Sequence, residues 1–108
     1  MIKQIEPRDL KAMLDRGERP YLLDVRQPWE NALAALPDSV LVPLDQLQAR
    51  VAEVAPPPGA LVVAYCHHGV RSLHAAAFLD AAGHPGVASL AGGIDRWSTE
   101  VDPGVRRY

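Results

Sequence analysis

The chain has 108 residues, of which 48% are hydrophobic and 22% are charged, and its formal net charge at pH 7 is −2. This length predicts one globular domain over residues 1–108, with no room for a second. The near-neutral charge gives no reason to expect nucleic acid or an anionic membrane as a partner. No apolar run approaches the roughly 20 residues of a membrane helix, and residues 1–6 lack the apolar core of a signal peptide. We therefore expect a cytoplasmic protein.

The first half of the chain alternates helical and strand patterns up to a run of three prolines. Pro7 suits the first turn of a helix, and Gly17 should end that helix. The next predicted elements are a strand at 21–26, a short helical turn at 28–33, a turn at 37–38, a strand at 40–42 and a helix at 45–55. The last of these is predicted from apolar residues at spacings of three and four. Residues 56–59 then break the chain in a surface connection.

The second half begins with a continuous apolar run at 61–65, which is typical of a strand covered on both faces of a sheet. A helix is predicted at 72–82, where alanine side chains permit close packing against a sheet, and Gly83 should end it. The remaining elements are a strand at 87–90, a tight turn at Gly92–Gly93, a short helix at 94–98 and an irregular tail at 102–108.

Strands that alternate with helices predict an α/β fold, namely a three-layer domain with a central, mostly parallel sheet and helices on both faces. In such sheets, sites form beyond the carboxyl ends of the strands. Cys66 is the only cysteine in the chain, and it directly follows the apolar run 61–65. The sequence therefore places this thiol at the edge of the sheet where sites form.

A single cysteine cannot form an internal disulfide and supplies too few thiolates for a zinc ribbon. Lone cysteines often pack as small buried hydrophobes, so neighbouring residues must indicate any further role for Cys66. Gly69 can take a positive φ and close a short loop before the next helix. The N–H groups of this loop and the helix dipole should stabilise a thiolate. Arg71 adds a charge suited to anionic oxygens, so the segment predicts a nucleophilic cysteine beside an anion site.

The loop length indicates which group the cysteine carries. Cysteine-based phosphatases place five residues between the cysteine and the arginine, and usually a histidine before the cysteine. Here four residues separate Cys66 from Arg71, and Tyr65 precedes the cysteine. A smaller ring should hold a smaller group, such as the single sulfur atom of a persulfide. A thiol phosphatase or an arsenate reductase is therefore an alternative that the spacing disfavours.

Four ordered segments resemble the single-domain rhodaneses, a family of sulfurtransferases, over nearly the whole chain. These segments are Leu22–Glu30, Val62–Ser72, Leu90–Trp97 and Asp102–Tyr108. The resemblance implies the rhodanese-like fold and a reaction in which Cys66 takes a sulfane sulfur from a donor, becomes a persulfide and passes the sulfur to a thiophilic acceptor. It implies ping-pong kinetics, and neither a metal nor an organic cofactor.

The resemblance implies a small anionic donor such as thiosulfate, and an acceptor that is cyanide in the usual assay and a thiol or a protein in the cell. Mercaptopyruvate and a protein persulfide are alternative donors, although the charge of Arg71 slightly favours the thiosulfate dianion. A non-catalytic, protein-partnered sulfur carrier is an alternative function, because residues 34–39 depart from the family's Gly-His-Ile-Pro-Gly-Ala. We expect a monomer or a weak homodimer.

Several residues receive supporting roles in this interpretation. The active-site loop that binds the substrate comprises His67, His68, Gly69, Val70, Arg71 and Ser72. The two histidines should line the mouth of the pocket and hold no metal, because adjacent loop residues rarely converge on one ion without further ligands. Asp24 and Arg26 should satisfy backbone groups at a strand end and so support the site. Trp29 and Trp97 should serve packing.

Overall fold

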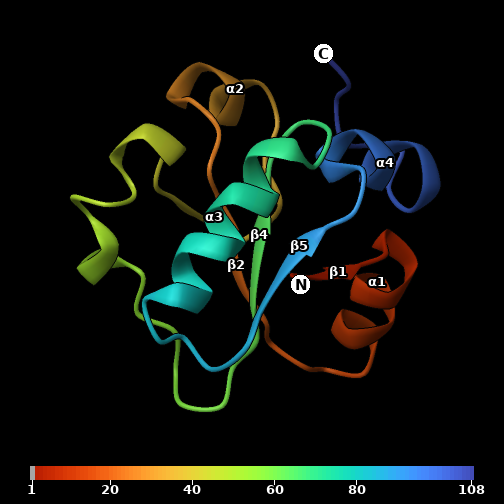
Figure 1. Ribbon diagram of the computed structural model, residues 1–108. Coiled ribbons are helices and arrows are strands. Elements are labelled where there is room, and N and C mark those ends of the chain that lie inside the picture. The colour runs from red at the N-terminus through yellow and green to blue at the C-terminus, as the bar shows by residue number, and fades with distance from the viewer. Residues whose placement is uncertain (1) are drawn as a thin grey trace.

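Five parallel strands form the central sheet of the computed structural model, which describes residues 2–108 (Figure 1). The strands are β1 (Lys3–Ile5), β2 (Tyr21–Asp24), β3 (Val40–Leu41), β4 (Val62–Tyr65) and β5 (Val87–Leu90). Their order across the sheet is β1-β5-β4-β2-β3, and each neighbouring pair is parallel. All the carboxyl ends therefore meet at one edge, where sites form in such sheets.

Helices cover both faces of this sheet. They are the α-helices α1 (Pro7–Asp15), α2 (Pro28–Leu33), α3 (Val70–Ala81) and α4 (Gly93–Glu100), and the short 3-10 helices η1 (Leu44–Gln46) and η2 (Val51–Glu53). Helices α1 and α4 contact each other and share one hydrophobic core with the sheet, whereas α3 and the 3-10 segments share the other. The predicted three-layer α/β fold is confirmed.

Strand β4 lies at the centre of the sheet, and all four of its residues are buried. Val63 and Tyr65 belong to the core that α1 and α4 complete, whereas Val62 and Ala64 belong to the core that α3 completes. This alternation is the period of two of a β-strand, with both faces apolar. The continuous apolar run that predicted the strand is thereby explained.

The single helix predicted at 45–55 is wrong, because the segment forms η1 and η2 with turns between them. Leu47 and Val54 are nevertheless buried, so the apolar spacing correctly indicated contact with the core. Arg50 interrupts the helical conformation with φ −113° and ψ 19°. Val51 and Val54 are β-branched and favour a helix only weakly, and the prolines that follow prevent its continuation.

Other differences concern short elements and their ends. Strand β1 was not predicted, since it has three residues and only Ile5 is buried, which is too little for a periodic signal. Strand β2 ends at Asp24, before Arg26, and α3 begins at Val70. Helix α4 continues beyond Ser98 to its last residue, Glu100.

The carboxyl edge of the sheet brings together segments that are distant in the sequence. Figure 1 shows α2, the start of α3, the start of α4 and the C-terminal end of the chain gathered there. Cys66 follows β4 directly and so lies at the middle of this edge. Within residues 2–108, no helix has the length and apolar character needed to cross a membrane.

Candidate active site

Cys66 is almost completely buried, with 1% of its surface exposed, between β4 and α3. Its Sγ atom accepts a hydrogen bond from the backbone N–H of Gly69 at 3.1 Å. The thiol in turn donates to Oγ of Ser72 at 3.5 Å, and this hydroxyl shares a 2.7 Å hydrogen bond with Oγ of Ser89. The sulfur is therefore held by polar groups of the loop and of the first turn of α3, in addition to its packing.

The loop from Cys66 to Arg71 closes through Gly69, which takes a left-handed conformation with φ 101° and caps α3. A Cβ atom at this position would lie 3.1 Å from the backbone nitrogen of Gly92. Glycine is required here both by the dihedral angle and by this close approach. The sequence-based expectation of a curved loop at a helix N-terminus agrees with this geometry.

The turn at Gly92–Gly93, after β5, brings the start of α4 into contact with the active loop. The N–H of Ile94 donates to the carbonyl of Cys66 at 2.9 Å, and the N–H of Asp95 donates to the carbonyl of His67 at 3.1 Å. A Cβ atom at Gly93 would collide with these same two carbonyls. The turn is tight, as predicted, but it also brings the first N–H groups of α4 onto the backbone of the active loop. This contact was not predicted from the sequence.

Arg71 forms an ion pair with Glu30, the buried third residue of α2. Nη1 donates to Oε1 at 2.6 Å, and Nη2 donates to Oε2 at 2.8 Å. The guanidinium of Arg71 lowers the pKa of Glu30 to about 2, with help from the N–H of Gln27 and against the effect of burial. The carboxylate is thus ionised at neutral pH, and it both orients Arg71 and balances its charge.

Asp24 and Arg26 form a second ion pair, whose side chains are completely buried, with Nη2 and Oδ2 2.8 Å apart. Arg26 also donates to the carbonyls of Ala34 at 2.6 Å and Glu30 at 3.4 Å. Asn31 donates to the Asp24 carboxylate at 2.9 Å. These contacts hold the middle of α2 and the residue that follows this helix against the end of β2.

The segment that departs from the family pattern, 34–39, retains a tight turn. Asp38 takes φ 59° in the left-handed region, which aspartate tolerates better than most residues. The hydroxyl of Tyr65 accepts a hydrogen bond from the N–H of Leu36 at 3.2 Å and shares another with Oγ of Ser39 at 2.8 Å. Tyr65 therefore anchors this segment from β4, one residue before the nucleophile.

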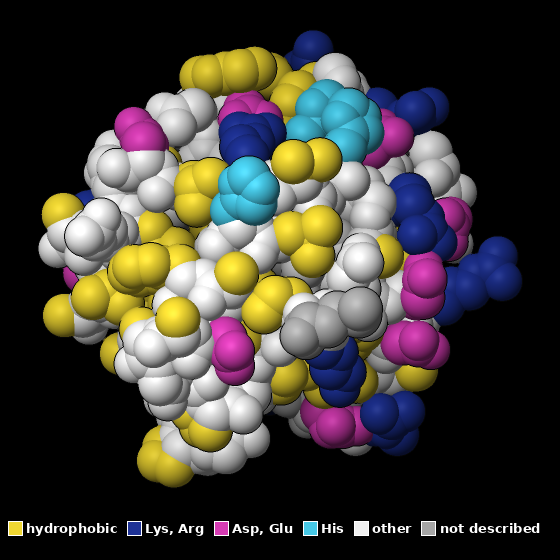
Figure 2. Space-filling model, viewed as in Figure 1, with side chains coloured by type: hydrophobic (Ala, Val, Ile, Leu, Met, Phe, Trp, Pro, Cys, Tyr) yellow, Lys and Arg dark blue, Asp and Glu magenta, His cyan; other side chains and the backbone are white. Residues whose placement is uncertain are grey.

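His67 and His68 lie at the outer side of the loop. Their rings stack with centroids 3.9 Å apart, and 65% of the side chain of His68 is exposed. Burial, assisted by the neighbouring His68, lowers the pKa of His67. Figure 2 shows histidine side chains on this part of the surface, beside charged and hydrophobic side chains.

A third group joins the histidines, because ligand atoms of His67, His68 and Asp95 lie within 4.8 Å of one another. A metal was not expected at the two histidines without further ligands, and Asp95 is a candidate further ligand that was not predicted from the sequence. Its carboxylate already accepts hydrogen bonds from Arg107 at 2.9 and 3.3 Å. A metal at this place would compete with that ion pair.

Tyr108 reaches the site from the end of the described chain. Its hydroxyl accepts a hydrogen bond from Nη1 of Arg26 at 2.8 Å and donates one to Oε2 of Glu30 at 2.8 Å. Its ring stacks on His67, and the exposed Trp29 contacts it edge-on with centroids 6.0 Å apart. Glu30 and Tyr108 were not predicted as site residues, although each belongs to a segment that carried the family resemblance.

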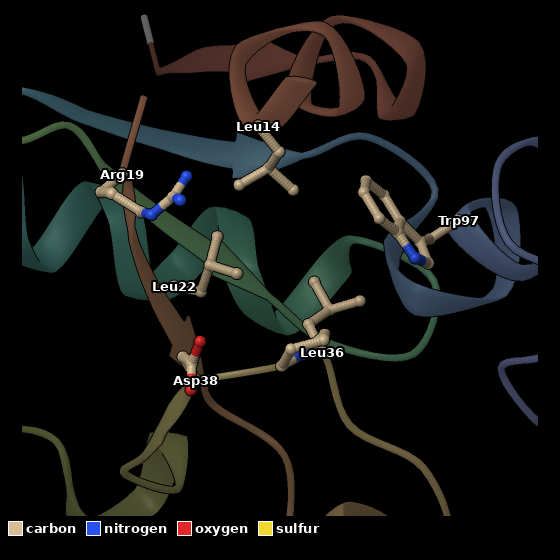
Figure 3. A pocket seen from close by; sticks show the side chains of 7 residues that line it. Leu14, Arg19, Leu22, Leu36, Asp38 and Trp97 are labelled. Atoms are coloured by element: carbon tan, nitrogen blue, oxygen red, sulfur yellow. The ribbon is translucent and has the colours of Figure 1, made fainter. Parts of the chain in front are cut away.

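A pocket of about 190 Å³ is lined in part by residues 36–38, and no residue of the active loop lines it. Figure 3 shows Leu14, Leu22, Leu36 and Trp97 around it, with Arg19 and Asp38 at one side. Trp97 is buried, as predicted, and forms part of its wall. The candidate active site is therefore the loop at the carboxyl edge, and the pocket is a separate feature.

Comparison with known proteins gives concordant findings. The model of the Rhodanese-like domain matches residues 6–100. A sulfurtransferase of Allochromatium vinosum is 35% identical over 98 residues, which are 91% of this chain and 90% of that protein. The probable adenylyltransferase/sulfurtransferase MoeZ of Mycobacterium tuberculosis is 33% identical over 104 residues, which are 96% of this chain but 26% of MoeZ. The crystal structure of a rhodanese-like domain protein from Staphylococcus aureus has a TM-score of 0.82 and 25% identity, over 99% of both chains.

Proposed function

Because the chain belongs to the rhodanese-like domain family, we propose that it moves a sulfane sulfur from a donor such as thiosulfate to a thiophilic acceptor, through a persulfide on Cys66. The relatives named sulfurtransferases support sulfur transfer in general. The observation that carries the proposal is the hydrogen bond from the Gly69 N–H to Sγ at 3.1 Å. It shows a backbone donor aimed at the sulfur at a helix N-terminus, where negative charge is stabilised.

The reaction consists of two displacements at sulfur. The Cys66 thiolate attacks the outer sulfur of thiosulfate, a new S–S bond forms, and sulfite leaves with the electrons of the bond that breaks. An acceptor such as cyanide then attacks the outer sulfur of the persulfide, and the thiolate leaves again as thiocyanate forms. The donor is reduced in the first step and the acceptor is oxidised in the second, so no other redox partner is needed. Backbone N–H groups stabilise the sulfur anion before and after each step.

The identity of the donor depends on the charge available at the loop. The sequence favoured a dianion because of the charge of Arg71, but Glu30 binds that guanidinium through two hydrogen bonds. The charge of Arg71 is therefore balanced, and the argument for thiosulfate over mercaptopyruvate or a protein persulfide becomes weaker. All three donors belong in the test.

A protein-partnered sulfur carrier is the second candidate. It is favoured by the 1% exposure of Cys66, which suits a donor or acceptor that opens the loop as it binds. It is also favoured by the similarity to MoeZ, in which the matching segment is about a quarter of a longer protein. The carrier would exchange sulfur readily with a protein thiol and turn over slowly with thiosulfate. Cysteine phosphatase activity is disfavoured by the four-residue spacing of Cys66 and Arg71.

The proposal is tested with the wild-type protein and Cys66→Ser, each incubated with thiosulfate and then with cyanide. We expect intact mass spectrometry to show a one-sulfur adduct on the wild type alone, and cyanide to discharge it as thiocyanate. If thiosulfate gives no adduct, the experiment is repeated with mercaptopyruvate and with a protein persulfide. Failure of all three donors would overturn the proposal, and release of phosphate from an aryl phosphate would favour the phosphatase alternative.

A further inference from the structure

We propose that Tyr108 is a positioning residue that braces both ends of the active loop from outside. The loop runs from Cys66 to Arg71. Tyr108 contacts His67, which follows Cys66, and Glu30, which forms the ion pair with Arg71. The effect on catalysis rests on the proposed sulfur transfer, whereas the effect on the loop itself does not.

At the first end, the ring of Tyr108 lies parallel to the ring of His67, with centroids 4.0 Å apart and an interplanar angle of 10°. His68 stacks on the opposite side of His67, so that three rings form one column beside Cys66. Stacked aromatic pairs contribute beyond the area they bury, and they restrict the orientation of each ring. Tyr108 thus fixes the residue next to the nucleophile.

At the second end, Tyr108 acts through its hydroxyl. The group donates to Oε2 of Glu30, the oxygen that also accepts from Nη2 of Arg71. The same hydroxyl accepts a hydrogen bond from Nη1 of Arg26. It therefore connects the buried ion pair of Asp24 and Arg26 to the ion pair that Glu30 forms at the end of the loop. Burial is the first cause that raises the pKa of Tyr108 to about 12, so the phenol keeps the proton that it donates.

The segment that carries Tyr108 is itself held in place. Oγ of Ser98 donates to the carbonyl of Val105 at 2.5 Å, and Arg107 forms an ion pair with Asp95 on α4. The same helix donates two N–H groups to the carbonyls of Cys66 and His67. The loop is therefore contacted both by α4 and by the segment that follows this helix. Tyr108 makes the contact from that segment.

The test compares Tyr108→Phe, Tyr108→Ala and the control Arg106→Ala. Phenylalanine keeps the ring stack and removes the hydroxyl, whereas alanine removes both. Arg106 is exposed in the same segment, and its side chain makes no hydrogen bond or ion pair within residues 2–108. Thermal unfolding of each variant identifies a temperature at which all of them are folded, and every rate is measured there.

The first measurement is alkylation of Cys66 by iodoacetamide, which requires no sulfur donor. Because bracing keeps the sulfur buried, we expect about tenfold faster alkylation in Tyr108→Ala, about threefold in Tyr108→Phe and no change in Arg106→Ala. The second is the NMR chemical shift of the His67 ring protons, which a stacked aromatic ring displaces. Tyr108→Ala should move these signals, and Tyr108→Phe should leave them close to wild type because it keeps the stacked ring.

The third measurement is the steady-state rate of sulfur transfer with the donor that forms the adduct. We expect kcat to fall about tenfold in Tyr108→Ala and about threefold in Tyr108→Phe, with a smaller change in KM, because the loss concerns orientation of the loop. Wild-type alkylation, His67 ring signals and kcat in the folded Tyr108→Ala would overturn the inference. If wild type forms no adduct with any donor, the proposed function fails, and alkylation and the His67 ring signals still decide whether Tyr108 braces the loop.

Should Tyr108→Ala fail to fold, Tyr108→Phe decides alone, since it preserves the ring and changes one oxygen atom. Faster alkylation of Cys66 in this variant would support the role of the hydroxyl, and an unchanged rate would contradict it.

Discussion

Glu30 and Arg71 lie 41 positions apart in the sequence, yet their carboxylate and guanidinium form two parallel hydrogen bonds of 2.6 and 2.8 Å. The contact joins α2 to the first turn of α3 across the carboxyl edge of the sheet. Such bidentate pairs combine charge with fixed geometry. Arg71 therefore has a defined orientation before any substrate arrives, and the carboxylate that orients it is buried.

This pair makes the stability of the protein depend on pH. The pKa of Glu30 is about 2 in the folded protein, below its ordinary value, because Arg71 binds the ionised form. The stabilisation is thus fully present above the ordinary pKa of glutamate, and it is lost as the pH falls through the folded value. Since Arg71 is about one-third exposed, we expect the pair to contribute about 2 kcal/mol to the free energy of unfolding after allowance for solvent screening.

The measurement is urea unfolding of wild type and Glu30→Gln between pH 7 and the lowest pH at which the protein stays folded. Wild type should lose stability below about pH 4.5, and the difference between the two proteins should shrink as the pH falls. The exposed ion pair of Lys11 and Asp15 provides the control, and Asp15→Asn should follow the wild-type curve closely. A constant difference at every pH would contradict the linkage to Glu30.

A second prediction concerns the glycine beneath the loop. Gly93→Ala places a methyl group against the carbonyls of Cys66 and His67, where no space exists, and the residue has φ +64°. We expect a loss of at least about 3 kcal/mol, since steric overlap adds to backbone strain. The matched control is Gly83→Ala, which has φ +98° and no atom within 4 Å of the added carbon. It should lose only about 1 kcal/mol, from strain alone.

Thermal and urea unfolding of the two variants separate these effects. Equal losses would mean that the loop can move away from α4, and that its carbonyl contacts with Ile94 and Asp95 are weak. The faster alkylation of Cys66 expected in Gly93→Ala, and not in Gly83→Ala, would report the same displacement at the sulfur.

A third prediction tests the anchor of the 34–39 segment. Tyr65→Phe removes the oxygen that accepts from the N–H of Leu36 and contacts Ser39, and it leaves a buried donor unpaired. We expect destabilisation by about 1–3 kcal/mol, the usual effect of an unsatisfied buried group. Tyr21→Phe is the control, because its hydroxyl contacts at 3.3 Å are exposed to water. Urea unfolding measures both, and similar losses would show that the buried contacts of Tyr65 contribute nothing extra.

Apart from β1, the order of the α-helices and strands could be predicted from the sequence because local patterns report it. The apolar run at 61–65 and the glycine at 69 determine a strand and a loop through burial and a dihedral angle, which neighbouring residues already specify. The segment 45–55 shows the limit of this reasoning. Its apolar spacing correctly predicted contact with the core. The backbone conformation between those contacts depends on packing against the sheet, which can override local helix propensity.

Only the part of the candidate site that is contiguous in the sequence could be predicted. Cys66, Gly69 and Arg71 lie within six residues, and their chemistry follows from that proximity. The groups that complete the site come from elsewhere: Glu30 from α2, Asp95 from α4 and Tyr108 from the end of the described segment. Their contacts arise from how parallel strands bring separate helices to one edge, and no local spacing encodes that arrangement.

The last prediction concerns the hydroxyl beside the sulfur. Oγ of Ser72 lies 3.5 Å from Sγ of Cys66 and 2.7 Å from Oγ of Ser89. When the cysteine is ionised, Ser89 can donate to Ser72, and Ser72 can donate to the sulfur. Ser72→Ala should slow formation of the one-sulfur adduct about tenfold, because it removes a donor to the sulfur anion. Ser89→Ala should slow it about threefold, because it removes only the group that orients Ser72.

Quenched-flow mass spectrometry under single-turnover conditions measures this step with the donor that gives the adduct. The control is Thr99→Ala, whose exposed hydroxyl donates to the carbonyl of Arg96 on α4, away from the sulfur. It should react at the wild-type rate. If Ser72→Ala also forms the adduct at the wild-type rate while folded, the sulfur anion is stabilised by backbone N–H groups alone, and the contact between the two side chains serves packing.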